Sequence, residues 1–277
     1  MNQEFPILEL ENFRFNELSD IFMLDHVTHG NHQITGHKHD FYLFFLIEQS
    51  NGTHSIDFVD YPVCNYQLHI LLPGQVHAWS LAKDTKGYQL MISKKVFETF
   101  AHYLQFSPMP QFNHPVLSLT ETSYRLLDSE FKQLNAELEK EKLYWDIIYL
   151  RCRLIVQLAV RDIEEEFKDL DMLKSNPIIV RYIKLVDDYY KQEKSVSFYA
   201  GHLNITPNYL NILCRKYTKI SANTIIQNRV LLESKRLLRI SEMTIKEIAY
   251  HLGFNDLAYF SNFFKAKTGE SPRLFRS

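Results

Sequence analysis

The feature that most constrains the fold of this chain is an approximate internal repeat in its last hundred residues. Residues 199–216 and 248–265 each predict a short helix, a tight turn and a second helix, and the two copies are offset by 49 to 50 residues. Each second helix begins after a residue that favours the N-cap position, Thr206 in the first copy and Asp256 in the second. The pattern therefore predicts two helix-turn-helix motifs.

The turns inside the two copies carry residues that allow a sharp change of direction. Gly253 stands in the second turn, where it supplies a permissive backbone. Asn204 takes the same place in the first turn, and asparagine tolerates left-handed geometry. The segment from Thr244 to Glu247 has the form of a capping box, which predicts the start of the first helix of the second copy.

The outward sides of the two second helices carry the residues that we expect to contact DNA. Helical spacing turns Leu210, Leu213, Cys214 and Tyr217 inward in one copy and Phe260, Phe263 and Phe264 inward in the other. The opposite sides hold, in matching positions, Asn208, Asn211, Ile212 and Arg215, and Ala258, Ser261, Asn262 and Lys265.

These side chains suit a helix that lies in the major groove. Asparagine can pair bidentately with adenine, and an Ala or Ile side chain can meet a thymine methyl group. Arg215, Lys216 and Lys265 would neutralise phosphates. The alternative is that these are ordinary solvent-facing sides of surface helices. The duplication, and its position in the basic half of the chain, favour DNA binding.

Charge is divided unevenly along the chain, although the formal net charge is only -2. From residue 175 onward there are 16 Lys and Arg against 8 Asp and Glu, whereas residues 1–174 hold 15 against 25. Such asymmetry indicates that the C-terminal part faces a polyanion.

A longer signature runs through and beyond the second copy of the repeat. It consists of Ile248-Ala249, Leu252-Gly253-Phe254-Asn255-Asp256, Tyr259-Phe260-Ser261, Phe263-Phe264-Lys265, Thr268-Gly269-Glu270-Ser271-Pro272 and Arg276. The signature resembles that of AraC/XylS transcriptional regulators. The first copy and the connecting segment, with Arg229 and Leu237-Leu238, resemble the same family, so that the resemblance covers residues 178–277.

The resemblance implies a seven-helix DNA-binding domain with two recognition helices, about 34 Å apart, in successive segments of the major groove. It implies base-reading positions at Asn208, Asn211 and Ile212, and at Ala258, Ser261 and Asn262, with Arg229 as a further DNA contact. This chain departs from the family pattern at Ile212, where a polar or basic residue is frequent. It also departs at Cys214 and Lys219, which commonly are phenylalanine and glycine.

The N-terminal half has the pattern of a β-rich domain followed by helices. Short strands are expected at residues 21–27, 41–48, 53–59, 67–72 and 87–93, which favours a sandwich or barrel. Helices are expected at residues 94–106, 120–140 and 143–167. The predicted fold class is thus α+β with two domains. We expect a cupin-like β-barrel with flanking helices over residues 1–168, a linker at 169–176, and an all-helical domain at 177–277.

Histidines are concentrated in the β-rich region, since eight of the 12 lie between His26 and His77. His37 and His39 precede the strand expected at 41–48, and His77 follows the one expected at 67–72. The segment Gly36-His37-Lys38-His39 with the later His77 resembles a cupin metal site. The usual glutamate and the closing asparagine are missing, with leucine at position 81, so the sequence predicts no bound metal and no cofactor. We instead expect a small-molecule effector site in a barrel mouth, or simply strand histidines with hydrogen bonds. The candidate effector-binding residues are His37, His39, Phe41, Tyr42, His77 and Trp79.

The expected protein is a cytoplasmic, effector-responsive regulator that binds double-stranded DNA as a homodimer, with RNA polymerase as a further partner. The three cysteines are widely spaced, and no signal peptide or membrane-length apolar run is visible. The helices at 120–167 would dimerise through an apolar stripe, unless that stripe packs on its own barrel. No nucleotide-binding or hydrolase motif indicates an enzyme. Two alternatives are a metal-dependent cupin enzyme and an interaction scaffold without DNA affinity.

Overall fold

The computed structural model describes residues 7–8, 21–25, 33–101, 114–167 and 176–277. The chain divides into two compact units, one ending at Lys168 and the next beginning at Asp169. The N-terminal unit combines two β-sheets with helices, and the described part of the C-terminal unit is entirely helical. The predicted α+β organisation, with a β-rich N-terminal part and a helical C-terminal part, is therefore confirmed.

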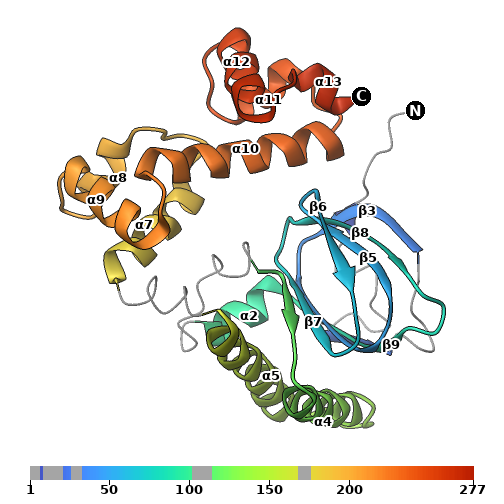
Figure 1. Ribbon diagram of the computed structural model, residues 1–277. Coiled ribbons are helices and arrows are strands. Elements are labelled where there is room, and N and C mark those ends of the chain that lie inside the picture. The colour runs from blue at the N-terminus through green and yellow to red at the C-terminus, as the bar shows by residue number, and fades with distance from the viewer. Residues whose placement is uncertain (1–6, 9–20, 26–32, 102–113, 168–175) are drawn as a thin grey trace. The chain divides into compact units, whose positions relative to one another are not determined.

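The N-terminal unit contains two five-stranded sheets (Figure 1). The first has the order β1-β3-β8-β5-β6 and the second the order β10-β7-β4-β9-β2. Only β1 and β3 pair in parallel among the described strands. The strands are β1 (Ile7–Leu8), β2 (Ile21–Asp25), β3 (Gln33–His39), β4 (Tyr42–Gln49), β5 (Gly52–Ile56), β6 (Val59–Val63), β7 (Gln67–Leu71), β8 (Val76–Leu81), β9 (Lys86–Ile92) and β10 (Val116–Ser118).

The two sheets remain separate in the part of the chain that the structure describes, so the expected closed cupin-like barrel is not formed there. Their inner faces share one apolar core. Alternate residues of β4, namely Leu43, Phe45 and Ile47, meet Ile56 of β5 and Trp79 of β8 in this core. Because successive side chains of a strand point to opposite faces, this alternation fixes which face of β4 looks toward the other sheet.

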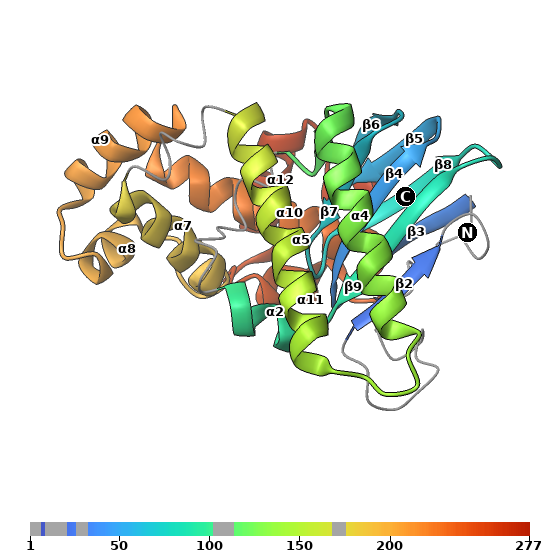
Figure 2. The same cartoon turned by 90° about the horizontal axis from the view of Figure 1, so that it is seen from below.

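The outer face of the second sheet is covered by helices (Figure 2). Phe44 of β4 points to this side and packs on Phe97 of α2 (Lys94–Ala101). Helices α4 (Glu121–Leu138) and α5 (Trp145–Glu166) pack against each other across the same face. The helices expected at 120–140 and 143–167 are thus confirmed. The expected helix at 94–106 is confirmed as far as Ala101, and its last residues lie outside the described ranges.

Sequence patterns identified only half of the strands in this unit. The five expected strands correspond to β2, β4, β5, β7 and β9. The other described strands, β1, β3, β6, β8 and β10, were not expected. Weak local β-propensity explains the omission, because β3 contains Gly36 and β6 contains Pro62. Proline is tolerated in β6 because this strand lies at the edge of its sheet.

The C-terminal unit is built around one long helix, α10 (Ala222–Ile240), which contacts helices of both helix-turn-helix motifs. The first motif consists of α8 (Val196–His202) and α9 (Pro207–Thr218), preceded by α7 (Pro177–Tyr189). The second motif consists of α11 (Ile245–His251) and α12 (Leu257–Thr268), followed by α13 (Pro272–Arg276).

Local sequence signals set the ends of these helices as expected. The side chain of Thr206 accepts a hydrogen bond from the Tyr209 backbone N–H, and that of Asp256 accepts one from the Ala258 N–H. Thr244 and Glu247 form both bonds of a capping box. Asn204 and Gly253 have φ values of 55° and 73°, the left-handed geometry that the two turns require.

None of the helices in the described part of the chain is both long enough and apolar enough to cross a bilayer.

Candidate nucleic-acid interface and buried histidine cluster

The second helices of the two motifs, α9 and α12, bury one side and expose the other. Leu210, Leu213 and Cys214 are buried in α9, and Phe260 and Phe264 are buried in α12, as helical spacing predicts. Tyr217 and Phe263, also expected inside, are half-buried. Three aromatic rings of the second motif, those of Phe254, Phe260 and Phe264, pack in succession at centroid distances of 5.2 and 6.1 Å.

The exposed sides of α9 and α12 repeat each other position by position at an offset of 50 residues. Asn208, Ile212 and Arg215 are exposed in α9, and Ala258, Asn262 and Lys265 are exposed at the matching places in α12. Lys216 is exposed as well. Each helix therefore presents a strip of small, apolar or amide side chains beside a cation, at the end of the strip nearest the helix C-terminus.

Two predicted base-reading residues lie differently from the others. Asn211 and Ser261, again matching positions, are half-buried. The Oδ1 atom of Asn211 accepts a hydrogen bond of 3.1 Å from the backbone N–H of Ala222, the first residue of α10. This bond orients the amide toward α10, so a bidentate contact of Asn211 with adenine requires the bond to open.

Arg229 is used inside the domain, which corrects its predicted role as a DNA contact. Its Nε donates to Asp187 of α7 at 2.8 Å, and its Nη1 donates to Glu233 at 3.1 Å. The guanidinium lies 4.0 Å from the centre of the Tyr190 ring. A phosphate contact would compete with these two half-buried carboxylates, through which Arg229 joins α7 to α10.

Two exposed tyrosines in the second helices were missed by the sequence reasoning. Tyr209 and Tyr259 occupy matching positions and are 46% and 67% exposed. Single exposed apolar side chains are common on protein surfaces, so it is the repetition at matching positions that sets these two apart. The repeat itself could have identified them, because both copies place tyrosine at the third residue after the N-cap.

The N-terminal unit encloses a cluster of buried histidines between its sheets. His37 and His39 of β3, His54 of β5, His69 of β7 and His77 of β8 are each at most 5% exposed. The first two were expected to precede a strand, but they lie within β3, where His37 pairs in register with His77. His54 and His69 were not predicted as site residues, although both lie in expected strands.

Most of the predicted effector residues lie in this cluster. The ring centroids of His37 and His39 lie 4.2 and 5.1 Å from that of His77, Phe41 stacks on His39, and Trp79 lies 5.3 Å from His77. Tyr42 does not belong to the cluster. It stacks on Phe97 of α2, on the outer face of the second sheet, because neighbouring residues of a strand face opposite sides.

Burial keeps these imidazoles neutral. It lowers the pKa of His39 and of His69 to about 3, and it lowers the pKa of His37, His54 and His77 as well. Desolvation is the largest cause for all five, because the charged form loses its hydration between the sheets. Each neutral ring therefore has one N–H donor and one lone-pair acceptor.

The hydrogen bonds determine which ring nitrogen carries the proton in the chain from His69 to His77. The Oε1 atom of Gln67 can only accept, so the Nε2 of His69 donates to it at 3.1 Å. The Nδ1 of His69 must then accept from the Nδ1 of His54 at 2.7 Å. The Nε2 of His54 in turn accepts from the Nδ1 of His77 at 3.1 Å. The chain ends on the Nε2 lone pair of His77.

The same reasoning applies to His39, whose Nδ1 donates to the backbone oxygen of Phe41 at 2.7 Å. Its Nε2 is therefore also an acceptor. The Nε2 atoms of His39 and His77 are both buried and have no hydrogen-bond partner among the described residues. The cluster thus presents two unsatisfied acceptors in an apolar setting. No three potential ligand side chains are arranged to hold a metal ion in the part of the chain that the structure describes.

Comparison with known proteins also indicates a helix-turn-helix domain in the C-terminal unit. Residues 199–277 match the family described as "Helix-turn-helix domain". The chain is 31% identical over 111 residues to the uncharacterized HTH-type transcriptional regulator YfiF of Bacillus subtilis, which covers 40% of this chain and 35% of YfiF. It is 22% identical over 256 residues to the HTH-type transcriptional activator RhaS of Escherichia coli O81, with 87% and 86% covered.

Two solved structures are similar in parts. The C-terminal domain of AraT, a response regulator from Geobacillus stearothermophilus, is 28% identical with a TM-score of 0.36, over 36% of this chain and 84% of that one. ToxT from Vibrio cholerae is 16% identical with a TM-score of 0.43, over 92% of this chain and 96% of that one.

Paired helix-turn-helix motifs with exposed polar second helices, in a basic half of the chain, define a DNA-binding protein. The family match and the relatives agree with this, because residues 199–277 match a helix-turn-helix domain and the similar proteins named here are HTH-type regulators of transcription. The named relatives are regulators of transcription, which argues against the enzymatic alternative.

Proposed function

We propose that the chain is a sequence-specific regulator that reads DNA with α9 and α12 and responds to a small molecule bound between its sheets. The position-by-position repetition of the exposed strips on α9 and α12 carries this proposal. Two unrelated surface helices have no reason to expose the same positions at a constant offset, whereas two helices that enter successive segments of one major groove do.

The proposed base readers are Asn208, Ile212, Ala258 and Asn262, with Ser261 at the edge of its strip. Arg215, Lys216 and Lys265 neutralise phosphates. Tyr209 and Tyr259 are added to the interface because they are exposed at matching positions. Asn211 is assigned a supporting role through its bond to Ala222, in place of direct base reading.

The experiment is selection of bound duplexes from a random DNA pool with the full chain. We expect a defined two-part sequence, and we expect Asn262→Ala to weaken its binding by about 1–3 kcal/mol and to relax the preference at one base pair. Asn228→Ala is the matched control, because Asn228 is an exposed amide on α10, outside both strips. Recovery of no preferred sequence would refute sequence-specific binding.

The effector site is proposed at the Nε2 atoms of His39 and His77, with His37, Phe41 and Trp79 around them. Both nitrogens are acceptors, so the ligand presents hydrogen-bond donors such as hydroxyl or amide N–H groups. A carboxylate would face two lone pairs and is disfavoured. A free cation is disfavoured too, because burying an unpaired charge is costly and the polar partners of this cluster are neutral. Tyr42 is left out, since it faces α2.

An effector of this kind acts by linkage, because it shifts the protein toward the arrangement that binds it more tightly. The test repeats the DNA selection and affinity measurement with a panel of neutral polyols and amides, against carboxylates of similar size. A compound that changes DNA affinity in the wild type and loses its effect in His39→Phe supports the site. An effect confined to carboxylates would contradict the proposed ligand chemistry.

The chain is further proposed to form a homodimer through α5. This helix exposes Ile147, Leu150 and Leu154 by 40%, 62% and 43%, at the i, i+3 and i+7 positions of one face. A second copy would cover this stripe. Leu150→Glu should yield a monomer in sedimentation experiments, whereas Asn228→Glu, at an exposed position of α10 in the other unit, should not. A wild-type chain that sediments as a monomer would contradict the dimer.

The proposed division of labour follows the predicted boundaries. Residues 1–168 form a cupin-like sensor with dimerisation helices, residues 169–176 a linker, and residues 177–277 the DNA-binding domain. The proposed setting is the cytoplasm, where double-stranded DNA and RNA polymerase are available as partners.

A further inference from the structure

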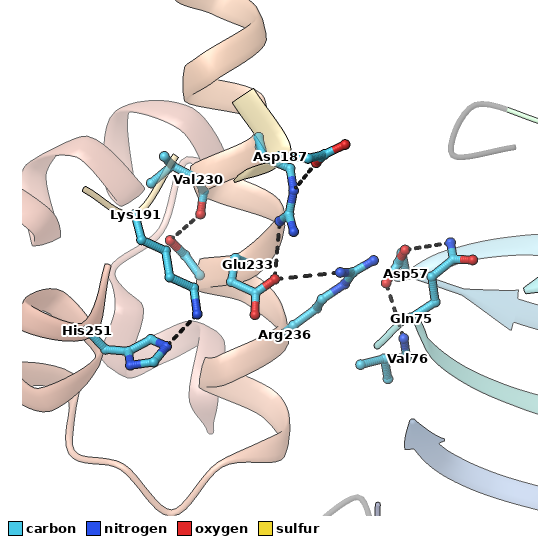
Figure 3. Close-up of polar contacts among 11 residues, drawn as sticks. Asp57, Gln75, Val76, Asp187, Lys191, Val230, Glu233, Arg236 and His251 are labelled. Carbon is cyan, nitrogen blue, oxygen red and sulfur yellow. Dashed lines mark hydrogen bonds and ion pairs between the residues drawn. The ribbon is translucent and has the colours of Figure 1, made fainter. Parts of the chain in front are cut away.

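The loop between α7 and α8 makes polar contacts with the end of α11 and the turn that follows it. The Nζ atom of Lys191 donates to the Nε2 of His251 at 2.8 Å (Figure 3). The Nζ of Lys194 donates to the backbone oxygens of Leu252, at 2.6 Å, and of Lys191, at 3.1 Å. These bonds connect the loop that precedes the first helix-turn-helix motif with the turn of the second motif.

The backbones of the loop and the turn are also in close contact. A Cβ atom built on Gly253 would lie 1.9 Å from the backbone oxygen of Lys191, a distance that no side chain tolerates. The ammonium of Lys194 lies 4.9 Å from the centre of the Phe254 ring. Burial lowers the pKa of Lys194, in agreement with a position inside the contact. The contact is therefore closely packed and not only a pair of flexible lysines.

Each side of this contact is attached to its own motif. On the loop side, the hydroxyl of Tyr199 in α8 donates to the backbone oxygen of Glu193 at 2.7 Å. On the turn side, the Phe254 ring packs on Phe260 of α12. A change in the position of either motif would therefore be transmitted through the contact to the other motif.

The helix α10 provides the second connection between the motifs. Arg229 of α10 pairs with Glu233 of the same helix at 3.1 Å and with Asp187 of α7 at 2.8 Å. Arg236 lies 3.6 Å from Glu233 (Figure 3). The first motif is thereby fixed to α10, and α10 leads directly into the second motif. Helices α11, α12 and α13 also pack on α10, and the Nε of Arg276 donates to the backbone oxygen of Leu238 at 3.3 Å. The loop–turn contact adds a direct connection between the two motifs that does not pass through α10.

We infer that the contact of Lys191 and Lys194 with residues 251–254, here called the inter-motif clamp, sets the spacing of DNA half-sites that the protein accepts. This inference rests on the proposed reading of one duplex by both α9 and α12. When two modules are rigidly linked and their spacing matches the duplex, binding of the first gives the second a high effective concentration at its half-site. This gain in affinity is lost when the half-sites do not match the spacing of the modules. The clamp residues are positioning residues, since none is assigned to contact a base.

The experiment compares three duplexes: the selected two-part site, the same site with one base pair inserted between its parts, and a site with only the α12 part. One inserted pair displaces the half-sites by about 3.4 Å and rotates them by about 34°. The wild type should lose about tenfold in affinity on insertion. Lys194→Met should bind the selected site with about fivefold lower affinity than the wild type. The inserted base pair should lower the affinity of this variant by less than about threefold, and its affinity for the single-part site should equal that of the wild type.

Two further variants separate positioning from charge. Lys184→Met removes an exposed charge from α7, outside the clamp, and should leave the insertion penalty unchanged. His251→Leu should behave as Lys194→Met does, whereas His251→Gln keeps an acceptor for Lys191 and should retain the wild-type penalty.

Two results would contradict the proposed role of the clamp. The first is an insertion penalty that stays at the wild-type value in Lys194→Met and His251→Leu. The second is an equal loss of affinity for all three duplexes in Lys194→Met and Lys184→Met. Failure of the proposed function looks different, because the wild type would then bind the single-part site and random DNA alike.

Discussion

Acidification should destabilise the N-terminal unit because its buried histidines are held neutral. Burial lowers the pKa of His39 and of His69 to about 3, whereas an unfolded chain has histidine pKa values of about 6.5. Below pH 6.5 these histidines are protonated in the unfolded state but stay neutral in the folded state. Stability is therefore present above pH 6.5 and falls continuously as the pH is lowered toward 3.

The expected size follows from the same values. Between pH 7.5 and pH 5.5 each of the two histidines should lower the free energy of unfolding by about 1.4 kcal/mol, so roughly 3 kcal/mol for the pair. His37, His54 and His77 have lowered pKa values too and act in the same direction. Carboxylates contribute little in this window, because their usual pKa values lie near 4.

Tryptophan fluorescence is a specific assay for this unit. Both tryptophans of the chain, Trp79 and Trp145, belong to it, so urea unfolding followed by fluorescence does not report on the helical unit. His69→Gln should reduce the pH dependence by about 1.4 kcal/mol. His202→Gln changes an exposed histidine of the other unit and is the control. An unfolding free energy that changes by less than about 0.5 kcal/mol between pH 7.5 and 5.5 would refute the reasoning.

Three substitutions in the C-terminal unit test the assignments made there. Lys265→Ala should weaken binding to all duplexes alike and lower the salt dependence by about one phosphate contact, and an effect confined to one sequence would contradict this role. Arg229→Met should lower the stability of the helical unit by about 1–3 kcal/mol, measured by circular dichroism, because it removes the cation that pairs with the half-buried Asp187, whereas Glu233 keeps Arg236. Asn211→Ala should cost about 1 kcal/mol of stability, because the bond to Ala222 is lost, whereas Asn211→Asp keeps the acceptor and should retain that stability. If Asn211→Ala lost base preference at unchanged stability, Asn211 would be a base reader after all.

The helices of the C-terminal unit could be predicted because their signals are local. The side chains of Thr206, Asp256 and Thr244 cap backbone groups two or three residues away, and Asn204 and Gly253 set their turns by their own φ angles. Such interactions are present in any short segment that contains them. The duplication then added the information that both second helices share one exposed pattern.

The strands and the histidine cluster depended on partners far along the chain. Strand β3 has little β-propensity of its own and exists through its pairing with β8, which brings His37 opposite His77. The contact of His54 with His69 joins different sheets, and the residue pattern within either strand does not predict it. The sequence gathered histidines in one region, but only the packing of the two sheets selected which of them meet and which nitrogen atoms remain unsatisfied.

By itself, then, the sequence determined the two motifs, their caps and turns, the outward strips and the resemblance to a family of regulators, because helix ends and helix faces depend on residues within a few positions of one another. The tertiary structure alone decided that Arg229 pairs with Asp187, 42 residues away, that Asn211 bonds to α10, and that Lys191 meets His251. Burial and long-range hydrogen bonding determine whether a polar side chain is available to a ligand, and both arise only when distant segments pack together.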